Sequence, residues 1–73
     1  MLKIAIMAGN YYFTIVPVEM VKHVNLKKTN TTVEVDEEQY IIFKGETFED
    51  SQKVDFIMDS EEEFELNKFR VIS

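Results

Sequence analysis

Residues 2–16, LKIAIMAGNYYFTIV, carry the clearest structural pattern in this chain of 73 residues. Apolar side chains alternate along residues 2–7, which is typical of a β-strand. Residues 8–10, Ala-Gly-Asn, have turn chemistry, because glycine and asparagine accept backbone conformations that other residues avoid. Residues 11–16 are aromatic or β-branched, which favours a second strand. The stretch therefore predicts an N-terminal β-hairpin.

The rest of the chain continues as short alternating segments separated by short polar loops. Short connections join antiparallel neighbours, and no internal repeat is visible. A chain of 73 residues leaves no room for a second unit, so we expect one domain over residues 1–73. The predicted fold is all-β, a small antiparallel meander or barrel of six to seven short strands. Further strands are expected at residues 17–28, 31–36, 39–44 and 53–58. A last strand is expected to run to Leu66 and, after a bulge or tight turn at residues 67–68, to continue over 69–72.

Two segments leave the prediction open between strand and helix. Residues 17–28 have a proline at the first helical position and lysines at the end, but their valines and their two-residue alternation favour a strand. The second segment, residues 61–69, begins within Ser60-Glu61-Glu62-Glu63, which matches a capping box and would start a helix. Its apolar spacing, however, fits a helix poorly. The alternative fold is therefore α+β with one short helix at 17–28 or 61–69. Residues 46–52 are expected to form a polar loop or a single helical turn anchored by Phe48.

Three segments are apolar on both sides, namely residues 2–7, 11–16 and 40–43. A half-solvated antiparallel sheet alternates between apolar and polar side chains, so these strands need cover on two sides. The cover can come from another part of the chain, from a second copy or from a different protein, because soluble monomers rarely leave a large apolar patch bare. The side chains expected to need this cover are Tyr12, Val16, Ile41 and Phe43.

Charge is unevenly distributed along the chain. Residues 1–45 carry five acidic and five basic side chains, whereas residues 46–73 carry nine acidic and three basic ones. The densest acidic run, residues 59–65, has two interpretations. It is a docking surface for a basic partner with Phe64 as an apolar anchor, or a solvated turn that discourages edge pairing. The predicted partner-binding residues are Asp59, Glu61, Glu62, Glu63, Phe64 and Glu65, together with Tyr12 and Phe43.

Residues that support catalysis or metal binding are scarce. The chain has no cysteine, which excludes disulfides and zinc-thiolate sites, and its one histidine, His23, is expected to be an exposed polar residue. It has no nucleophile elbow, no glycine-rich phosphate loop and no EF-hand spacing. We therefore expect a protein that is not an enzyme, with no catalytic residues, no cofactor and no metal.

Charge and hydropathy also bear on the partners. A net charge of −6 opposes nucleic acid and anionic membranes, although Lys22, His23, Lys27 and Lys28 form a small basic cluster. The longest uncharged stretch, residues 4–18, is shorter than the roughly 20 apolar residues that a bilayer span needs. The sequence therefore predicts a cytoplasmic protein without a membrane partner.

Three functions follow from these patterns. The first is a non-catalytic protein–protein interaction module, an inhibitor or adaptor with an acidic C-terminal rim. The alternative is a structural subunit of a homo-oligomer, and the third is a small nucleic-acid-binding β-barrel. In length, acidity and lack of cysteine the chain resembles the short proteins of bacteriophages and mobile elements. That resemblance implies a protein that blocks or redirects a host protein, and no motif assigns residue roles.

Overall fold

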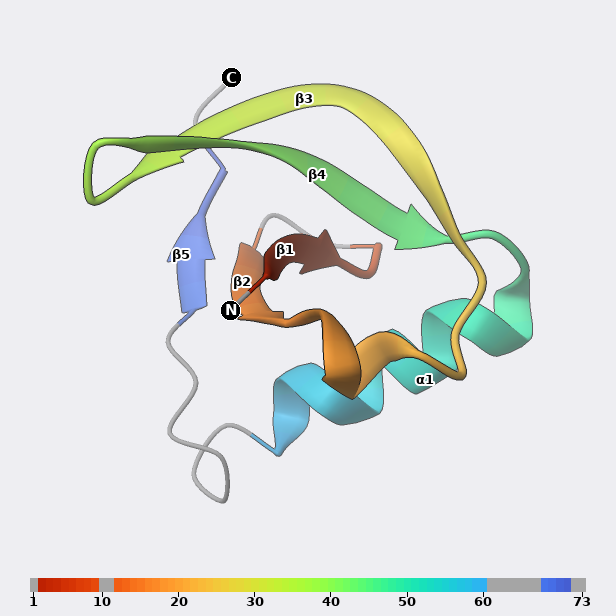
Figure 1. Cartoon of the computed structure of the whole chain (residues 1–73). Coiled ribbons are helices and arrows are strands. Elements are labelled where there is room, and N and C mark those ends of the chain that lie inside the picture. The colour runs from red at the N-terminus through yellow and green to blue at the C-terminus, as the bar shows by residue number, and fades with distance from the viewer. Residues whose placement is uncertain (1, 10–11, 61–67, 72–73) are drawn as a thin grey trace.

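The computed structural model describes residues 2–9, 12–60 and 68–71, and strands make up the larger part of them (Figure 1). The strands are β1 (Lys3–Met7), β2 (Tyr12–Pro17), β3 (Leu26–Val35), β4 (Glu38–Gly45) and β5 (Lys68–Arg70). A 3-10 helix, η1, covers Val18–Val21, and an α-helix, α1, covers Phe48–Asp59. The mostly-β prediction is confirmed, and in this part of the chain the strands are five rather than six or seven.

The strands form one mixed sheet in the order β3-β4-β1-β2-β5. β1 and β2 are the predicted N-terminal hairpin, with Lys3 opposite Pro17 and Met7 opposite Phe13. β1 pairs in parallel with β4, with Ala5 opposite Ile42, so the prediction of a simple antiparallel meander is wrong at this position. The parallel pairing places the first strand in the middle of the sheet, where both of its faces are buried.

The sheet curls into a half-barrel with an apolar cluster on each face. In Figure 1, β1 and β2 lie between α1 on one side and the arching β3–β4 ribbon on the other. On the helix side, Ile6 and Val16 pack with Val54 and Met58 of α1. On the concave side, Phe13 and Ile42 pack with partly buried residues that include Val33 of β3. Phe13 of β2 and Val33 of β3 belong to the same cluster, although β4 and β1 lie between these two strands in the sheet. The sheet must therefore curl to bring them together.

The chain itself therefore covers most of the two-sided apolar strands. Val16, one of the side chains expected to need cover, is fully buried against the helix side. Phe43 is half-buried, whereas Tyr12 and Ile41 remain 48% and 39% exposed. Helix α1 and the curled ribbon supply the second layer, and no second copy is needed for the cores of β1 and β2.

The β3–β4 hairpin turns at Asp36 and Glu37, one residue earlier than the predicted turn at residues 37–38. Both residues have positive φ, 52° and 69°, and Val35 pairs with Glu38 across a two-residue loop. Two successive positive φ values are typical of a type I′ turn, whose twist matches that of the flanking strands.

Helix α1 at Phe48–Asp59 is the main correction to the predicted fold, because a strand was expected at residues 53–58 and a polar loop or only a single helical turn at residues 46–52. Thr47 caps the helix by accepting a hydrogen bond from Asp50 N at 3.1 Å. Asp50, Val54 and Met58 are buried, so burial recurs every fourth residue and not every second. Phe56 and Phe48 are 71% and 79% exposed, and Phe48 anchors nothing in the core.

Of the two segments left open between strand and helix, the first differs from expectation and the second is mostly outside the described residues. Residues 18–21 form only the short η1 helix, and β3 begins at Leu26, so neither a strand nor a long helix spans 17–28. Ser60 is the C-cap of α1, since its backbone N–H donates to Phe56 O at 3.1 Å, and most of the predicted segment 61–69 lies outside the described residues. The segment predicted to end at Leu66 lies outside the described residues, and β5 at Lys68–Arg70 overlaps the predicted final strand.

Candidate functional site

The side of α1 that faces away from the sheet combines aromatic and acidic side chains. Phe48 and Phe56 are the most exposed aromatic residues in the described part of the chain, at 79% and 71%. Surface phenylalanines scattered singly are ordinary, but α1 exposes two of them on a helix of twelve residues. The exposed residues that we call the outer face of α1 are Phe48, Glu49, Gln52, Lys53, Asp55, Phe56 and Asp59.

A groove runs between the outer face of α1 and the segment that contains η1. Its volume is about 390 Å³. Met20 and Val24 of this segment and Ile57 of α1 are half-buried and pack against the helix-side cluster, so they form an apolar base. Phe56 and the polar side chains of the helix form the opposite wall. The residues that line this η1–α1 groove are Met20, His23, Val24, Glu49, Gln52, Lys53, Phe56 and Ile57.

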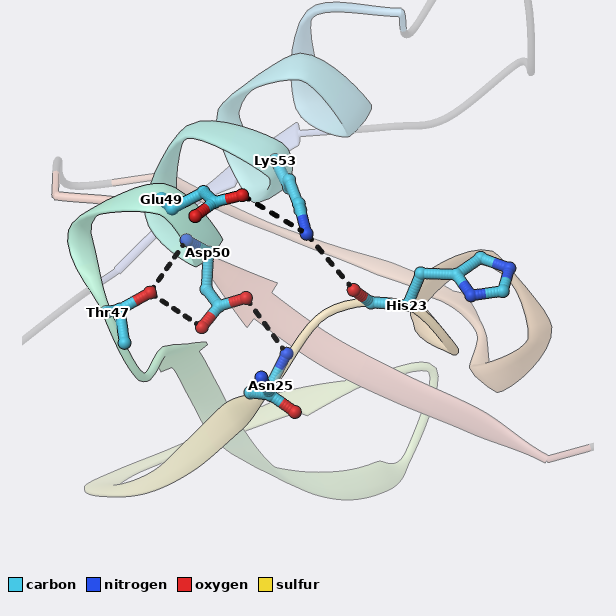
Figure 2. Close-up of polar contacts among 6 residues, drawn as sticks. All are labelled: His23, Asn25, Thr47, Glu49, Asp50 and Lys53. Carbon is cyan, nitrogen blue, oxygen red and sulfur yellow. Dashed lines mark hydrogen bonds and ion pairs between the residues drawn. The ribbon is translucent and has the colours of Figure 1, made fainter.

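Asp50 fixes the two sides of the groove relative to each other (Figure 2). Its Oδ1 accepts a hydrogen bond from Asn25 N at 3.2 Å, and its Oδ2 accepts one from Thr47 Oγ1 at 2.8 Å. The residue is only 3% exposed, so its carboxylate relies on these donors instead of water. The Thr47 hydroxyl and the Asn25 backbone N–H favour the ionised form and hold the pKa of Asp50 below its ordinary value.

Two backbone contacts complete the attachment of α1. Glu46 N donates to Asn25 O at 2.8 Å, so the chain entering the helix is bonded to the chain entering β3. Gly45, at the end of β4, lies directly against the first turn of the helix. A Cβ atom at Gly45 would lie 2.6 Å from the Asp50 carbonyl carbon and 2.8 Å from Ser51 Cα, which is inside van der Waals contact. The glycine therefore permits the close approach that sets the position of α1 on the sheet.

Lys53 spans the groove at its rim. Figure 2 shows its Nζ between Glu49 and the backbone carbonyl of His23, while the imidazole ring points away. The amine lies 3.9 Å from Glu49 Oε1 and donates to His23 O at 3.4 Å. Both side chains of the ion pair are exposed, so the pair adds little to stability. It offsets the charge of Glu49, one of the three acidic residues of the outer face.

The structure separates the residues that the sequence assigned to a binding surface. Asp59 is exposed at the end of α1, whereas Tyr12 lies on β2 opposite Arg70. Phe43 lies on β4 and is half-buried opposite Lys28. Strand β1 stands between β2 and β4, so Tyr12 and Phe43 are not neighbours. The other predicted residues, Glu61, Glu62, Glu63, Phe64 and Glu65, lie outside the described residues.

Sequence reasoning missed Phe48 and Phe56 as surface residues, because it assigned one to an anchoring role and the other to a strand. The signal that reveals their exposure is the spacing Thr47-x-x-Asp50, a capping box with aspartate in place of glutamate. A helix that starts there buries Asp50, Val54 and Met58 together and turns both phenylalanines outward.

A second groove, of about 470 Å³, lies at the open side of the half-barrel between β3 and β5. Phe13 and Phe69, whose ring centroids are 5.4 Å apart, line it together with Val33 and Val35. Its charged lining residues, Glu34 and Arg70, are of opposite sign. The outer face of α1 differs from this groove in carrying three acidic side chains and one basic side chain.

Within residues 2–9, 12–60 and 68–71, no three metal-ligating side chains come together. No helix in that part of the chain is long and apolar enough to cross a membrane. The chain matches no protein-family model, and comparisons with curated proteins and with solved structures find no match.

Proposed function

We propose that this protein is a non-catalytic interaction module, an inhibitor or adaptor, that binds another protein through the outer face of α1 and the adjoining η1–α1 groove. The observation that supports the proposal is the exposure of Phe48 and Phe56, 79% and 71%, on a helix that is firmly fixed to the sheet. Buried aromatic anchors supply much of the binding energy in protein interfaces. A rigid helix presents such anchors with little loss of conformational entropy on binding.

Charge supports a basic surface on the partner. The outer face of α1 carries Glu49, Asp55 and Asp59 against the single base Lys53. In the sequence, Glu61, Glu62 and Glu63 follow directly. An acidic rim around an apolar centre accelerates association with a basic surface and disfavours acidic ones.

The same charges argue against a structural subunit of a homo-oligomer and against a nucleic-acid-binding protein. In a symmetric dimer through the outer face of α1, each copy would place its acids opposite those of the other copy. A nucleic acid would meet a protein of net charge −6. A different protein with a basic surface is therefore the occupant that the face fits best.

The test is to recover a partner and titrate it. Phe56 is replaced with a photo-crosslinking phenylalanine derivative, and the protein cross-linked in cells that carry the gene is identified and purified. Its affinity is then measured by calorimetry for the wild type, for Phe48→Ser/Phe56→Ser and for the control Leu2→Ser, which changes an equally exposed apolar residue outside the groove. We expect the double variant to bind about tenfold more weakly or worse and the control to bind normally. Equal affinities for all three proteins would overturn the proposal.

A further inference from the structure

The two edge strands of the sheet, β3 and β5, border the groove of about 470 Å³, here called the β3–β5 groove. We infer that it binds a single extended segment of another protein, which adds a β-strand to the free edge of β3. This site is separate from the proposed binding face. Its lining residues Phe13 and Val33 belong to the cluster on the concave side of the sheet, whereas α1 packs on the other side.

The register of the β3–β4 hairpin shows which backbone groups of β3 point into the open. Val35 and Glu38 flank the two-residue loop, so they form a hydrogen-bonded pair. Hydrogen-bonded and non-hydrogen-bonded pairs alternate along an antiparallel ladder. Glu34 and Thr32, one and three residues before Val35, are therefore in non-hydrogen-bonded pairs, and their backbone N–H and C=O groups point away from β4.

These outward groups favour an extended chain as the occupant. Thr32 and Glu34 line the β3–β5 groove, and among residues 2–9, 12–60 and 68–71 no strand other than β4 pairs with β3. A free strand edge is a row of donors and acceptors at a fixed spacing. The main chain of an added strand satisfies such a row, whereas a helix has already used its own backbone groups.

The side chains of the groove specify alternate apolar positions in the added strand. Val33 and Val35 are half-buried on the concave side, and Phe69 of β5 is 37% exposed across from them. Residues directly opposite each other on neighbouring strands point to the same face of the sheet. Apolar residues opposite Val33 and Val35 would therefore pack between these valines and Phe69.

Glu34 specifies one polar position. Its side chain is exposed, and its partner across the β3–β4 pair is the uncharged Gln39. In the described part of the chain, no ion pair joins Glu34 to Arg70, the other charged residue of the lining. Opposite charges directly across two strands stabilise the pairing. A lysine or arginine opposite Glu34, between the two apolar positions, is therefore the favoured residue.

A second copy of this chain fits the groove less well than a single segment. Each edge strand of the sheet is already paired on its other side, β3 with β4 and β5 with β2. A second copy would therefore bring at least two adjacent strands, about 4.8 Å apart, to the edge of β3. The second of these strands would have to lie where β5 bounds the groove.

The inference is tested by NMR on the full-length ¹⁵N-labelled protein. The probe is the capped peptide Thr-Val-Lys-Val-Thr. In antiparallel orientation its valines lie opposite Val33 and Val35 and its lysine lies opposite Glu34. The first control peptide has glutamate in place of lysine. The second keeps every side chain but carries N-methyl groups on the lysine and on the last threonine, whose amides would donate to β3.

Hydrogen exchange gives a pattern that alternates from residue to residue. In the free protein, the amides of Val33 and Val35 should be protected and those of Thr32 and Glu34 unprotected. The probe peptide should protect Thr32 and Glu34. Both control peptides should bind about tenfold more weakly or worse, since each loses hydrogen bonds or a favourable charge pair.

A pair of variants tests the same edge from the protein side. Glu34→Pro removes one outward N–H and leaves the ladder to β4 intact, as proline does on edge strands, and it should abolish peptide binding. Glu34→Gln keeps the N–H and should still show protection of the Thr32 amide, with a lower affinity. If Glu34→Pro fails to fold, the N-methylated peptide makes the same test. Phe48→Ser/Phe56→Ser should bind the probe normally, so a failure of the α1 face is distinguishable from a failure of this site.

Three results would overturn the inference. One is equal affinity of the unmodified and N-methylated peptides, or no binding of the probe at all. Another is protection of Thr32 and Glu34 in the dilute free protein, because part of this chain would then occupy the edge. The third is protection that appears as the protein concentration is raised, because the occupant would then be a second copy.

Discussion

Asp50 is the residue on which the geometry of the η1–α1 groove depends most. It is buried, it caps the start of α1 with Thr47, and it accepts a hydrogen bond from Asn25 in the segment that leads into β3. A single carboxylate thus joins the start of α1 to a segment 25 residues earlier in the chain. Its ionised form is favoured mainly by the Thr47 hydroxyl and the Asn25 backbone N–H, with a smaller contribution from the charge of Lys53, which makes the attachment sensitive to protonation.

The pKa of Asp50 predicts an acid-labile contribution to stability. Because the pKa is lower in the folded state than in the unfolded state, ionised Asp50 stabilises the fold above the unfolded-state value of 3.8. This contribution is lost as the pH falls through the folded-state value. We expect Asp50→Asn to be less stable than wild type at neutral pH and to lose less stability on acidification. Urea unfolding measured across the acidic range checks this.

Asp55→Asn is the matched control, since it makes the same chemical change on the exposed side of the same helix. It should keep the acid dependence of the wild type. If Asp50→Asn and the wild type lose stability in parallel on acidification, the role assigned to the Asp50 carboxylate is wrong.

Gly45 is the second residue whose identity the structure explains. We expect Gly45→Ala to destabilise the fold by about 1–3 kcal/mol, since its Cβ would overlap the backbone of Asp50 and Ser51. Gly9→Ala is the comparison, because Gly9 has a φ of +67° and open space around it. Its cost should come from backbone conformation alone, about 1 kcal/mol. Thermal unfolding of both variants gives the comparison, and a Gly45→Ala protein as stable as wild type would contradict the close packing of helix and strand.

Among the elements, α1 is the one that sequence reasoning misplaced. Val54, Phe56 and Met58 alternate with polar neighbours and fit a strand as well as a helix. Short apolar runs carry this ambiguity because periods of two and of 3.6 residues differ little over six positions. The capping residues Thr47 and Asp50 settle the choice, but their effect depends on Asn25, a tertiary contact that a local pattern does not contain.

The two periodicities predict opposite results for a pair of substitutions. In a strand, residues 56 and 58 would share the buried face, whereas in α1 Met58 is 3% exposed and Phe56 is 71% exposed. We therefore expect Met58→Ala to cost about 2–5 kcal/mol and Phe56→Ala to cost less than about 0.5 kcal/mol in the free energy of unfolding. Chemical denaturation monitored by circular dichroism measures both. Comparable losses of unfolding free energy for the two variants would contradict the helix and support the strand predicted at residues 53–58.

The N-terminal hairpin, in contrast, was predictable from the sequence. Its apolar alternation over residues 2–7, its turn at residues 8–10 and the β-branched and aromatic composition of its second strand agree with one another. The parallel pairing of β1 with β4 was not predictable, because it depends on how the curled sheet closes over Phe13 and Ile42. Agreement among local signals thus identified the hairpin, and long-range pairing decided the topology.

In the whole molecule, the fold covers its strands with its own elements and leaves apolar surface on its helix. The strands apolar on both sides suggested a sheet surface in need of a partner, and α1 and the β3–β4 ribbon bury most of it. The uneven charge noted in the sequence persists, since three of the acidic residues lie on the outer face of α1. Of the candidate site, the sequence therefore predicted the acidic character and one residue, Asp59, but not the aromatic centre.

The most direct test of the binding face is the solvent accessibility of the phenylalanine rings, measured by NMR with a soluble paramagnetic agent in the free protein and in the complex with the recovered partner. In the free protein, the agent should strongly enhance the relaxation of the ring protons of Phe48 and Phe56, and only weakly that of the ring protons of the buried Phe13. On complex formation, Phe48 and Phe56 should become protected while exposed Tyr12 keeps its accessibility. Rings of Phe48 and Phe56 that are as accessible in the complex as in the free protein would contradict the account.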